Sequence, residues 1–298
     1  MTPQVTNVFS IDVEDWFHIL DLEQGVPSEY WQDQDSRVEG NTRRLLDLLR
    51  RHNTHATWFV LGWIAERYPA MVQEIHLEGH EIATHGFGHG LVYEQSPEVF
   101  RADVERSIQV IEGITSVRPR GYRAPGFSLT MQSLWAFSIL SSLGLSYDSS
   151  LFPATRGHGG LPGSNPLPHR IDLDDERHLV ELPIATTSLC GKRIAYCGGG
   201  YLRLLPLAFA RRIIRRTNAQ GIPVVLYIHP RDIDPNQPRI SMPVARRFKT
   251  YVGLRKTYDK VNVLLQEFSF GTAGRLLASV SIDELPGVRV SSDSLTQL

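Results

Sequence analysis

The chain has 298 residues, of which 42% are hydrophobic and 21% charged, a balance typical of a globular protein with a large core. Its 31 basic and 32 acidic residues give a formal net charge of −1, so no global field would draw it to nucleic acid or to an anionic membrane. Basic residues cluster only locally, in RRIIRR (211–216) and ARRFK (245–249), which we interpret as solvated helix faces. Two cysteines, Cys190 and Cys197, do not suggest a disulfide scaffold.

No segment of the chain has the pattern of a membrane-directed sequence. Residues 1–15 lack the basic and apolar regions of a signal peptide. No stretch approaches the roughly 18 uninterrupted apolar residues that a transmembrane helix needs. We therefore expect a cytoplasmic protein without a transmembrane segment, or a periplasmic one if an export signal has been removed. The sequence is compatible with a homo-oligomer but does not specify one.

Strand-like and helix-like runs alternate along the chain. Strands are predicted at 8–13, 56–62, 81–85, 118–125, 145–150, 179–184 and 223–229. Helices are predicted at 42–52, 65–80, 96–114, 131–144, 206–221 and 255–268. This alternation indicates an α/β fold with a parallel sheet, and about seven such strands favour a barrel, irregular or incomplete, over an open sheet. Functional residues are then expected at the carboxyl ends of the strands.

The first predicted strand ends in three acids, Asp12, Glu14 and Asp15. Carboxylates are costly to bury unless they are paired or bound to a metal ion. Because side chains alternate along a strand, Asp12 and Glu14 share a face, while Asp15 points away unless the strand has already ended. One acid of the pair can bind a metal ion while the other acts as a base near a water molecule.

The third predicted strand ends in two histidines, His85 and His89, within the run HGFGH. This spacing brings both imidazoles to one side of a turn, and the intervening glycines let the backbone bend tightly. Imidazole is a common ligand for zinc, cobalt, nickel and iron. The spacing is a weak signal by itself, but together with the acidic strand end it predicts a metal site.

Three further strand ends carry candidate catalytic residues. Arg123 lies where it can pair with and orient a carboxylate. His229 ends the last strong strand and is a candidate general acid for a leaving amine. Asp148 is a candidate partner that would raise the pKa of that histidine, with a turn-capping role as the alternative.

At these residues the chain resembles the polysaccharide deacetylases with the NodB-homology fold, the family-four carbohydrate esterases. The matching motifs occur in family order over residues 5–230 as DVED, HGFGH, RAPGF, YDSS and YIH. A narrower resemblance, to a subgroup tied to exopolysaccharide loci in exosortase-bearing bacteria, extends to the C-terminal run FKTYVGLRKTYDKVNVLLQEFSFGT. That subgroup carries a C-terminal extension of unassigned function.

The resemblance implies a distorted (β/α) barrel of seven or eight strands. It also implies hydrolytic removal of an N-acetyl group from an amino sugar with one divalent metal ion, zinc before cobalt, nickel or iron. The implied catalytic roles are a base, its positioning residue, an acid and the residue that tunes the acid: Asp12, Arg123, His229 and Asp148. The implied metal ligands are Glu14, His85 and His89.

Two departures from the family pattern bear on these assignments. The usual motif has adjacent aspartates, so the third ligand here is Glu14, with Asp15 as the alternative. Gly126 stands between the Arg-x-Pro turn and the usual aromatic residue, so the backbone N–H of Gly126 would help to hold the oxyanion. The predicted sugar contacts are aromatic: Phe127, Trp16 and Tyr201. The glycine-rich run 197–206 is interpreted as a tight barrel turn or a substrate-facing loop.

The predicted organisation is a barrel at 1–235, a helical extension packed on it at 236–278, and a loosely ordered tail at 279–298. The expected partner is an N-acetylated glycan of a bacterial exopolysaccharide or its precursor. Two other functions remain open. One is a C–N hydrolase of the same fold that acts on a small cyclic amide or ureide, and the other is a catalytically silent glycan-binding module.

Overall fold

The structure is a computed structural model that describes residues 5–297, except 21–24, 156–158, 175–176, 190 and 292–293. Cys190 lies outside the described residues, whereas Cys197 is a buried free thiol. The strands are β1 (Asn7–Val13), β2 (Thr57–Val60), β3 (Glu81–Thr84), β4 (Gly121–Tyr122), β5 (Tyr147–Asp148), β6 (His169–Leu173), β7 (His178–Glu181), β8 (Thr186–Leu189), β9 (Lys192–Ala195), β10 (Val225–Ile228), β11 (Phe270–Gly271), β12 (Gly287–Ser291) and β13 (Ser294–Gln297).

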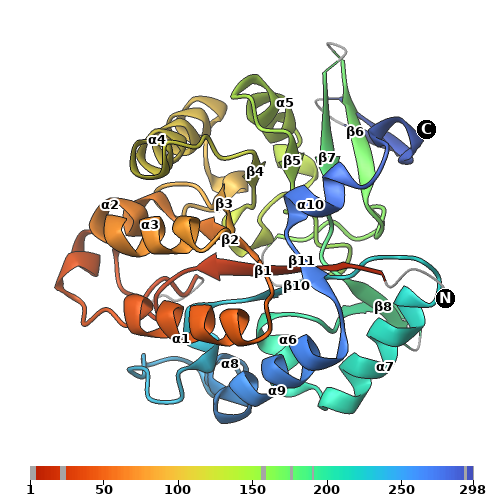
Figure 1. Cartoon of the computed structure of the whole chain (residues 1–298). Coiled ribbons are helices and arrows are strands. Elements are labelled where there is room, and N and C mark those ends of the chain that lie inside the picture. The colour runs from red at the N-terminus through yellow and green to blue at the C-terminus, as the bar shows by residue number, and fades with distance from the viewer. Residues whose placement is uncertain are drawn as a thin grey trace.

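One large, mostly parallel sheet organises the molecule (Figure 1). Its order is β10-β1-β2-β3-β4-β5-β7-β6-β12-β13, and β11 pairs with β1 in addition. The strands from β10 to β7 in this order all run parallel to their neighbours. A hydrogen bond from the Ala185 amide to the Val225 carbonyl, 3.4 Å long, joins the segment after β7 back to β10. This α/β arrangement brings the carboxyl ends of these parallel strands to one side of the sheet.

Helices surround this sheet, as Figure 1 shows. They are α1 (Val38–Arg51), α2 (Gly62–Arg67), α3 (Pro69–Leu77), α4 (Pro97–Thr115), α5 (Trp135–Ser142), α6 (Gly199–Leu204), α7 (Leu207–Asn218), α8 (Val244–Tyr251), α9 (Leu254–Glu267) and α10 (Ala273–Ala278). The single helix predicted at 65–80 is divided into α2 and α3. Pro69 explains the division, because proline starts a helix well but cannot continue one.

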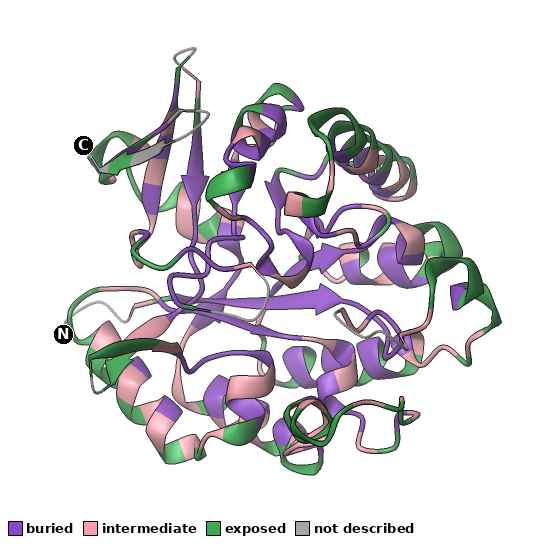
Figure 2. Cartoon of the chain, turned by 180° about the vertical axis from the view of Figure 1, so that it is seen from behind, coloured by how far each residue is buried: buried purple, intermediate pink, exposed green. Residues whose placement is uncertain are grey.

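The core lies between the sheet and its helices, and Figure 2 shows the central strands buried while the outer helix faces are exposed. All seven residues of β1 are buried, including the polar Asn7, Ser10 and Asp12. Polar groups at such positions need partners, and Ser10 donates its hydroxyl to the Leu226 carbonyl at 2.8 Å. Among the described residues, no helix is both long and apolar enough to cross a lipid bilayer.

The C-terminal region takes part in the sheet. β11 pairs with β1, and α10 packs on β1. Within residues 279–298, for which a loosely ordered tail was predicted, β12 pairs in parallel with β6 through Val288 and Val290. Both valines are buried, whereas Arg289 between them is exposed. This alternation is the pattern of a strand with one face on the core.

Candidate active site

Asp12 is the last polar residue of β1 and lies beside Arg123, which follows β4. Arg123 Nη1 donates to Asp12 Oδ1 at 2.6 Å and to the Ser10 hydroxyl at 2.9 Å. The remaining guanidinium nitrogens donate to Ser149, from Nε to its carbonyl at 3.1 Å and from Nη2 to its hydroxyl at 2.8 Å. Arg123 is fully buried and its guanidinium lies 4.0 Å from the centre of the Phe59 ring. The carboxylate of Asp12 is therefore held in one orientation.

Glu14, His85 and His89 form a compact cluster just beyond the ends of β1 and β3. Glu14 Oε1 lies 3.2 Å from His85 Nε2 and 3.0 Å from His89 Nε2. One ligand atom from each residue fits within 4.8 Å of the other two, and all three side chains are buried. Burial raises the pKa of Glu14, but His89 and His229 outweigh it, so the pKa lies well below its ordinary value. Glu14 is therefore an anion.

The cluster has the donor set of a metal site. His85 Nδ1 lies 2.7 Å from the Arg123 carbonyl, which can only accept, so Nδ1 carries the proton. In the neutral ring, Nε2 then presents a lone pair to another acceptor, Glu14 Oε1. Two acceptors remain this close only when a proton or a metal ion lies between them. Two imidazoles and a carboxylate, with one histidine fixed through its second nitrogen, fit a divalent ion such as zinc.

Asp103 fixes the loop that carries these histidines. Its two carboxylate oxygens accept the backbone N–H groups of Phe87 and Gly88 at 2.7 and 2.8 Å. His89 has a positive φ of 56°, a strained backbone conformation for a residue with a side chain. Strain of this kind persists only where the surroundings enforce it. The sequence analysis did not find Asp103, because it lies on α4, away from the motif it supports.

His229 follows β10 and is oriented by Asp232. His229 Nδ1 lies 2.9 Å from Asp232 Oδ2, and the His229 backbone N–H donates to the same oxygen at 2.9 Å. The other ring nitrogen, Nε2, faces the site, 3.9 Å from Asp12 Oδ2 and 3.8 Å from Glu14 Oε1. Burial lowers the pKa of His229, but Glu14 and Asp232 more than compensate, so its pKa is raised. The ring is therefore suited to give up a proton from Nε2.

The predicted pairing of Asp148 with His229 is corrected by this geometry. β5, which ends at Asp148, lies between β4 and β7, whereas β10 lies at the far side of β1. Asp148 is in register with Glu181 on β7, and it accepts the hydroxyl of Ser150 at 2.6 Å. Burial raises the pKa of both acids, most strongly that of Glu181, which the neighbouring Asp148 raises further. Asp232 could have been found from its position three residues after His229, a spacing typical of a helical turn.

Asp15, the alternative metal ligand, points away from the cluster. Its carboxylate accepts the Ser36 hydroxyl at 2.6 Å and the backbone N–H groups of Arg37 and Val38 at 3.0 and 3.2 Å. These groups precede and begin α1, so Asp15 caps that helix. Glu14 is the acid that the structure places with the two histidines.

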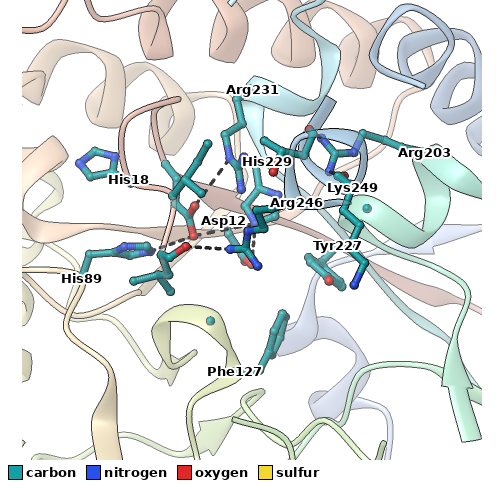
Figure 3. A pocket seen from close by; sticks show the side chains of 16 residues that line it. Asp12, His18, His89, Phe127, Arg203, Tyr227, His229, Arg231, Arg246 and Lys249 are labelled. Atoms are coloured by element: carbon teal, nitrogen blue, oxygen red, sulfur yellow. Dashed lines mark hydrogen bonds and ion pairs between the residues drawn. The ribbon is translucent and has the colours of Figure 1, made fainter. Parts of the chain in front are cut away.

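A pocket of about 170 Å³ opens over these groups (Figure 3). Asp12, Glu14, His89, His229, Gly126 and Phe127 are among the residues that line it. Of the other predicted sugar contacts, Trp16 and Tyr201 do not line this pocket. Trp16 is buried and donates its indole N–H to the Asp35 carbonyl at 3.0 Å, and Tyr201 packs near Phe152. Tyr227, which the sequence analysis did not select, stands beside Phe127 with ring centres 4.8 Å apart.

The glycine-rich run expected to form a turn or loop begins helix α6. A Cβ atom at Gly198 would lie only 2.1 Å from the Tyr227 ring, so a side chain there would displace it. The next residues start α6, and Gly200 lines the pocket. The run therefore lets a backbone segment pass close behind an aromatic wall of the site.

His18 also lines the pocket, and the sequence analysis did not select it. The Asp15 backbone N–H donates to His18 Nδ1 at 2.8 Å, so Nε2 carries the proton of the neutral ring. Burial and the nearby His89 hold the pKa of His18 well below its ordinary value. Nε2 is buried and has no hydrogen-bond partner among the described residues. This N–H is a donor available to a ligand in the pocket.

Comparison with known proteins finds a family model that covers part of this site. A family model described as polysaccharide deacetylase matches residues 31–147. Residues 31–147, which include His85, His89 and Arg123, are therefore a domain of this family. This family consists of hydrolases that act on the C–N bonds of acetylamino sugars. A second model, a domain of unknown function (DUF3473), matches residues 149–278 and includes both His229 and the predicted extension.

Relatives of the deacetylase domain act on glycans of more than one kind. Peptidoglycan-N-acetylglucosamine deacetylase of Bacillus cereus is 32% identical over 96 residues, which cover 32% of this chain and 35% of that protein. Chitooligosaccharide deacetylase of Sinorhizobium fredii is 34% identical over 97 residues, covering 32% of this chain and 41% of the relative. The chain thus spans about a third of the length of the curated relatives it matches.

A solved protein from Mycobacterium smegmatis, provisionally described as a polysaccharide deacetylase, shares the fold over the whole chain. The TM-score is 0.65 at 20% sequence identity, with 100% of this chain and 96% of that one covered. The likeness includes the DUF3473 region. The deacetylase domain and the residues after it therefore share their fold with this solved protein.

Proposed function

We propose that this protein is a metal-dependent hydrolase that removes N-acetyl groups from amino sugars of a bacterial exopolysaccharide or its precursor. The observation that carries the proposal is the convergence of His85 and His89 on Glu14, beside an aspartate that Arg123 orients. The family of the deacetylase domain supports the reaction type. The narrower resemblance to the exopolysaccharide-associated subgroup supports the polymer class.

Glu14, His85 and His89 would hold the metal ion, for which zinc is our first candidate. When bound, such an ion polarises the acetamide carbonyl and lowers the pKa of a water molecule. Asp12 takes the proton of the attacking water. Its position is fixed by Arg123, so little reorganisation is needed in the transition state.

Two groups complete the chemistry of the chain itself. The Gly126 backbone N–H has no acceptor among the described residues and lines the pocket, so it can donate to the developing oxyanion. His229, held through Nδ1 by Asp232, gives its Nε2 proton to the departing amine. The products are acetate and a free amino sugar. The proton that Asp12 took from the water then returns His229 to its protonated form.

Metal content and acetate release test the proposal together. Wild type, His85→Ala/His89→Ala and the control His178→Ala, an exposed histidine of β7, are loaded with zinc and analysed by mass spectrometry. Each is assayed for acetate release from chitooligosaccharides. About one metal ion per chain in wild type and control, lost with acetate release in the double variant, would support the proposal.

The other outcomes lead to other functions. Metal bound without acetate release from any N-acetylated glycan would overturn the substrate assignment and direct attention to small cyclic amides and ureides. No metal after loading with zinc, cobalt, nickel or iron would overturn the mechanism. Glycan binding without any turnover would then indicate a binding module.

A further inference from the structure

The lining of the pocket has an excess of positive charge. Its acidic lining residues are Asp12 and Glu14, while its cationic side chains number four: Arg203, Arg231, Arg246 and Lys249. Arg246 and Lys249 come from α8, within the DUF3473 region. Figure 3 shows both side chains over the same pocket as Asp12 and His229.

The carboxylates near the site are already paired with other cations. Asp12 pairs with Arg123 at 2.6 Å, and Asp232 pairs with Arg203 at 3.1 Å. Glu14 is held by its two histidines, with Arg231 Nε 3.9 Å away. Lys249 is exposed and forms no ion pair in the part of the chain that the structure describes. Its charge is therefore not used within this site.

Two of the four cationic side chains at the pocket, those of Arg203 and Arg246, are fixed in place by hydrogen bonds to backbone carbonyls. Arg203 of α6 donates from Nη1 to the Thr250 carbonyl at 2.6 Å and from Nη2 to the Lys249 carbonyl at 3.0 Å. Arg246 Nη2 donates to the Leu20 carbonyl, in the loop after β1, at 2.7 Å. These contacts tie α8 to two other segments that line the pocket. Because these guanidinium groups are already held in position, less side-chain conformational entropy is lost when a ligand binds to them.

The sequence around α8 carries the same charge bias. Residues 235–258 contain six cations and no acid: Arg239, Arg246, Arg247, Lys249, Arg255 and Lys256. The whole chain, in contrast, has a net charge of −1. The basic cluster at 245–249 is thus divided by the helix, with Arg246 and Lys249 at the catalytic pocket and Arg247 outside it. Local positive potential of this kind concentrates anionic ligands.

We propose that the site takes an N-acetylated glycan that carries an anionic group next to the reacting amino sugar, and that Arg246 and Lys249 bind this group. The proposal rests on the deacetylase function proposed above and specifies its substrate class. The anion is a carboxylate of a uronic acid or a phosphate attached to the sugar, because guanidinium and ammonium groups bind both. A neutral chitin-like chain would offer no anionic group to Lys249, which forms no ion pair with the described residues.

Three probes separate these cases. Zinc-loaded wild type is assayed for acetate release with a neutral chitotetraose, with a tetrasaccharide of alternating glucuronate and N-acetylglucosamine, and with N-acetylglucosamine 1-phosphate. The variants are Lys249→Gln, Arg246→Gln/Lys249→Gln and the conservative Lys249→Arg. The matched control is Arg247→Gln, on the same helix but outside the pocket.

We expect kcat/KM for one anionic probe, relative to chitotetraose, to fall by about tenfold in Lys249→Gln and further in the double variant. Lys249→Arg should restore most of the ratio, and Arg247→Gln should leave it as in wild type. The ratio should also fall as ionic strength rises, because salt screens exposed charges. The probe that responds identifies the anion as carboxylate or phosphate. An unchanged ratio for both anionic probes would overturn the inference while the deacetylase function stands.

Direct binding keeps the inference testable if no probe releases acetate. Titration calorimetry measures the Kd of each anionic probe with wild type and with Lys249→Gln. Lys249 is exposed, so its replacement should not affect folding. Weaker binding in the variant, by about tenfold, would support the anionic subsite even though the proposed reaction had failed. Equal binding in both proteins would overturn it.

Discussion

Arg123 donates a 2.6 Å hydrogen bond to Asp12 at a place where both side chains are almost wholly buried. Removing one partner of such a pair leaves the other as an uncompensated buried charge. We therefore expect Arg123→Met to lower the free energy of unfolding by about 3–5 kcal/mol and to abolish turnover. Urea denaturation and acetate release measure the two effects.

A second replacement separates charge from packing in this pair. Arg123→Met/Asp12→Asn removes both charges, so it should recover part of the lost stability but none of the activity. If the double variant were as unstable as the single one, the hydrogen bonds of Arg123 to Ser149 would be the main contribution and the buried charge a minor one.

Asp232→Asn tests whether His229 acts in the tautomer that Asp232 fixes. Asparagine can keep a contact to the His229 ring, but a neutral side chain no longer stabilises the protonated, positively charged form of that ring. We expect kcat to fall by roughly 10²-fold or more while zinc content stays at the wild-type level. Steady-state kinetics and metal analysis of the same preparation check this. Near-normal kcat would exclude His229 as the acid that this aspartate orients.

Much of the site could be predicted because its residues occur in local motifs. Asp12, Glu14, His85, His89, Arg123 and His229 stand at strand ends that hydrophobic runs identify, and each predicted strand overlaps an observed one. The strands that the sequence analysis missed lack a buried hydrophobic run or pair with a strand far away in the sequence. β8 and β9 are half exposed and form a separate hairpin, so they lack a buried run. β12 begins 114 residues after the end of β6, its partner strand, and such pairing depends on the fold as a whole.

The roles that sequence reasoning missed depend on contacts between distant segments. Glu181 meets Asp148 only because β5 and β7 pair in register. Arg246 and Lys249 reach the pocket only because Arg203 and the Leu20 carbonyl hold α8 there. A run such as ARRFK has the same appearance on a solvated helix and beside an active site. Its position therefore had to come from the structure.

Glu14 and Asp15 should respond differently to replacement. Asp15→Ala removes the cap of α1, so the free energy of unfolding should fall by about 2 kcal/mol while one zinc ion per chain remains bound. Glu14→Gln should lose zinc with a smaller effect on the stability of the metal-free protein. Metal analysis and urea denaturation of both variants distinguish them. Loss of zinc from Asp15→Ala alone would reverse the assignment of the third ligand.

Glu181→Gln should be nearly neutral for stability. Burial and the neighbouring Asp148 raise the pKa of Glu181 well above its ordinary value, which favours the protonated form, and a glutamine can reproduce both hydrogen-bonding roles of that form. Oε1 would still accept the Leu151 N–H, and the amide would donate to Asp148 in place of the carboxyl proton. We expect a change below about 1 kcal/mol, against about 3 kcal/mol for Glu181→Ala, which leaves a cavity and an unpaired N–H. A large loss in Glu181→Gln would show that the glutamate is ionised.

His80 should make the protein less stable in acid. Burial, His55 and Arg50 lower its pKa from 6.5 to about 4, and its Nδ1 accepts the Ala56 N–H at 3.1 Å. Between these two pKa values the unfolded chain binds the proton and the folded chain does not. Stability is therefore fully present above the unfolded pKa, falls as the pH drops through 6.5, and levels off below about 4.

The size of this effect can be isolated with one variant. Between about pH 7 and about pH 5, His80 should account for a loss of about 2 kcal/mol in the free energy of unfolding. His80→Asn keeps an acceptor for the Ala56 N–H but does not titrate. Between the two pH values this variant should therefore lose about 2 kcal/mol less unfolding free energy than wild type. His178→Asn, at an exposed position, should behave like wild type. If His80→Asn and wild type lost the same stability in urea denaturation at the two pH values, His80 would be protonated in the folded protein and its burial would not oppose the charge.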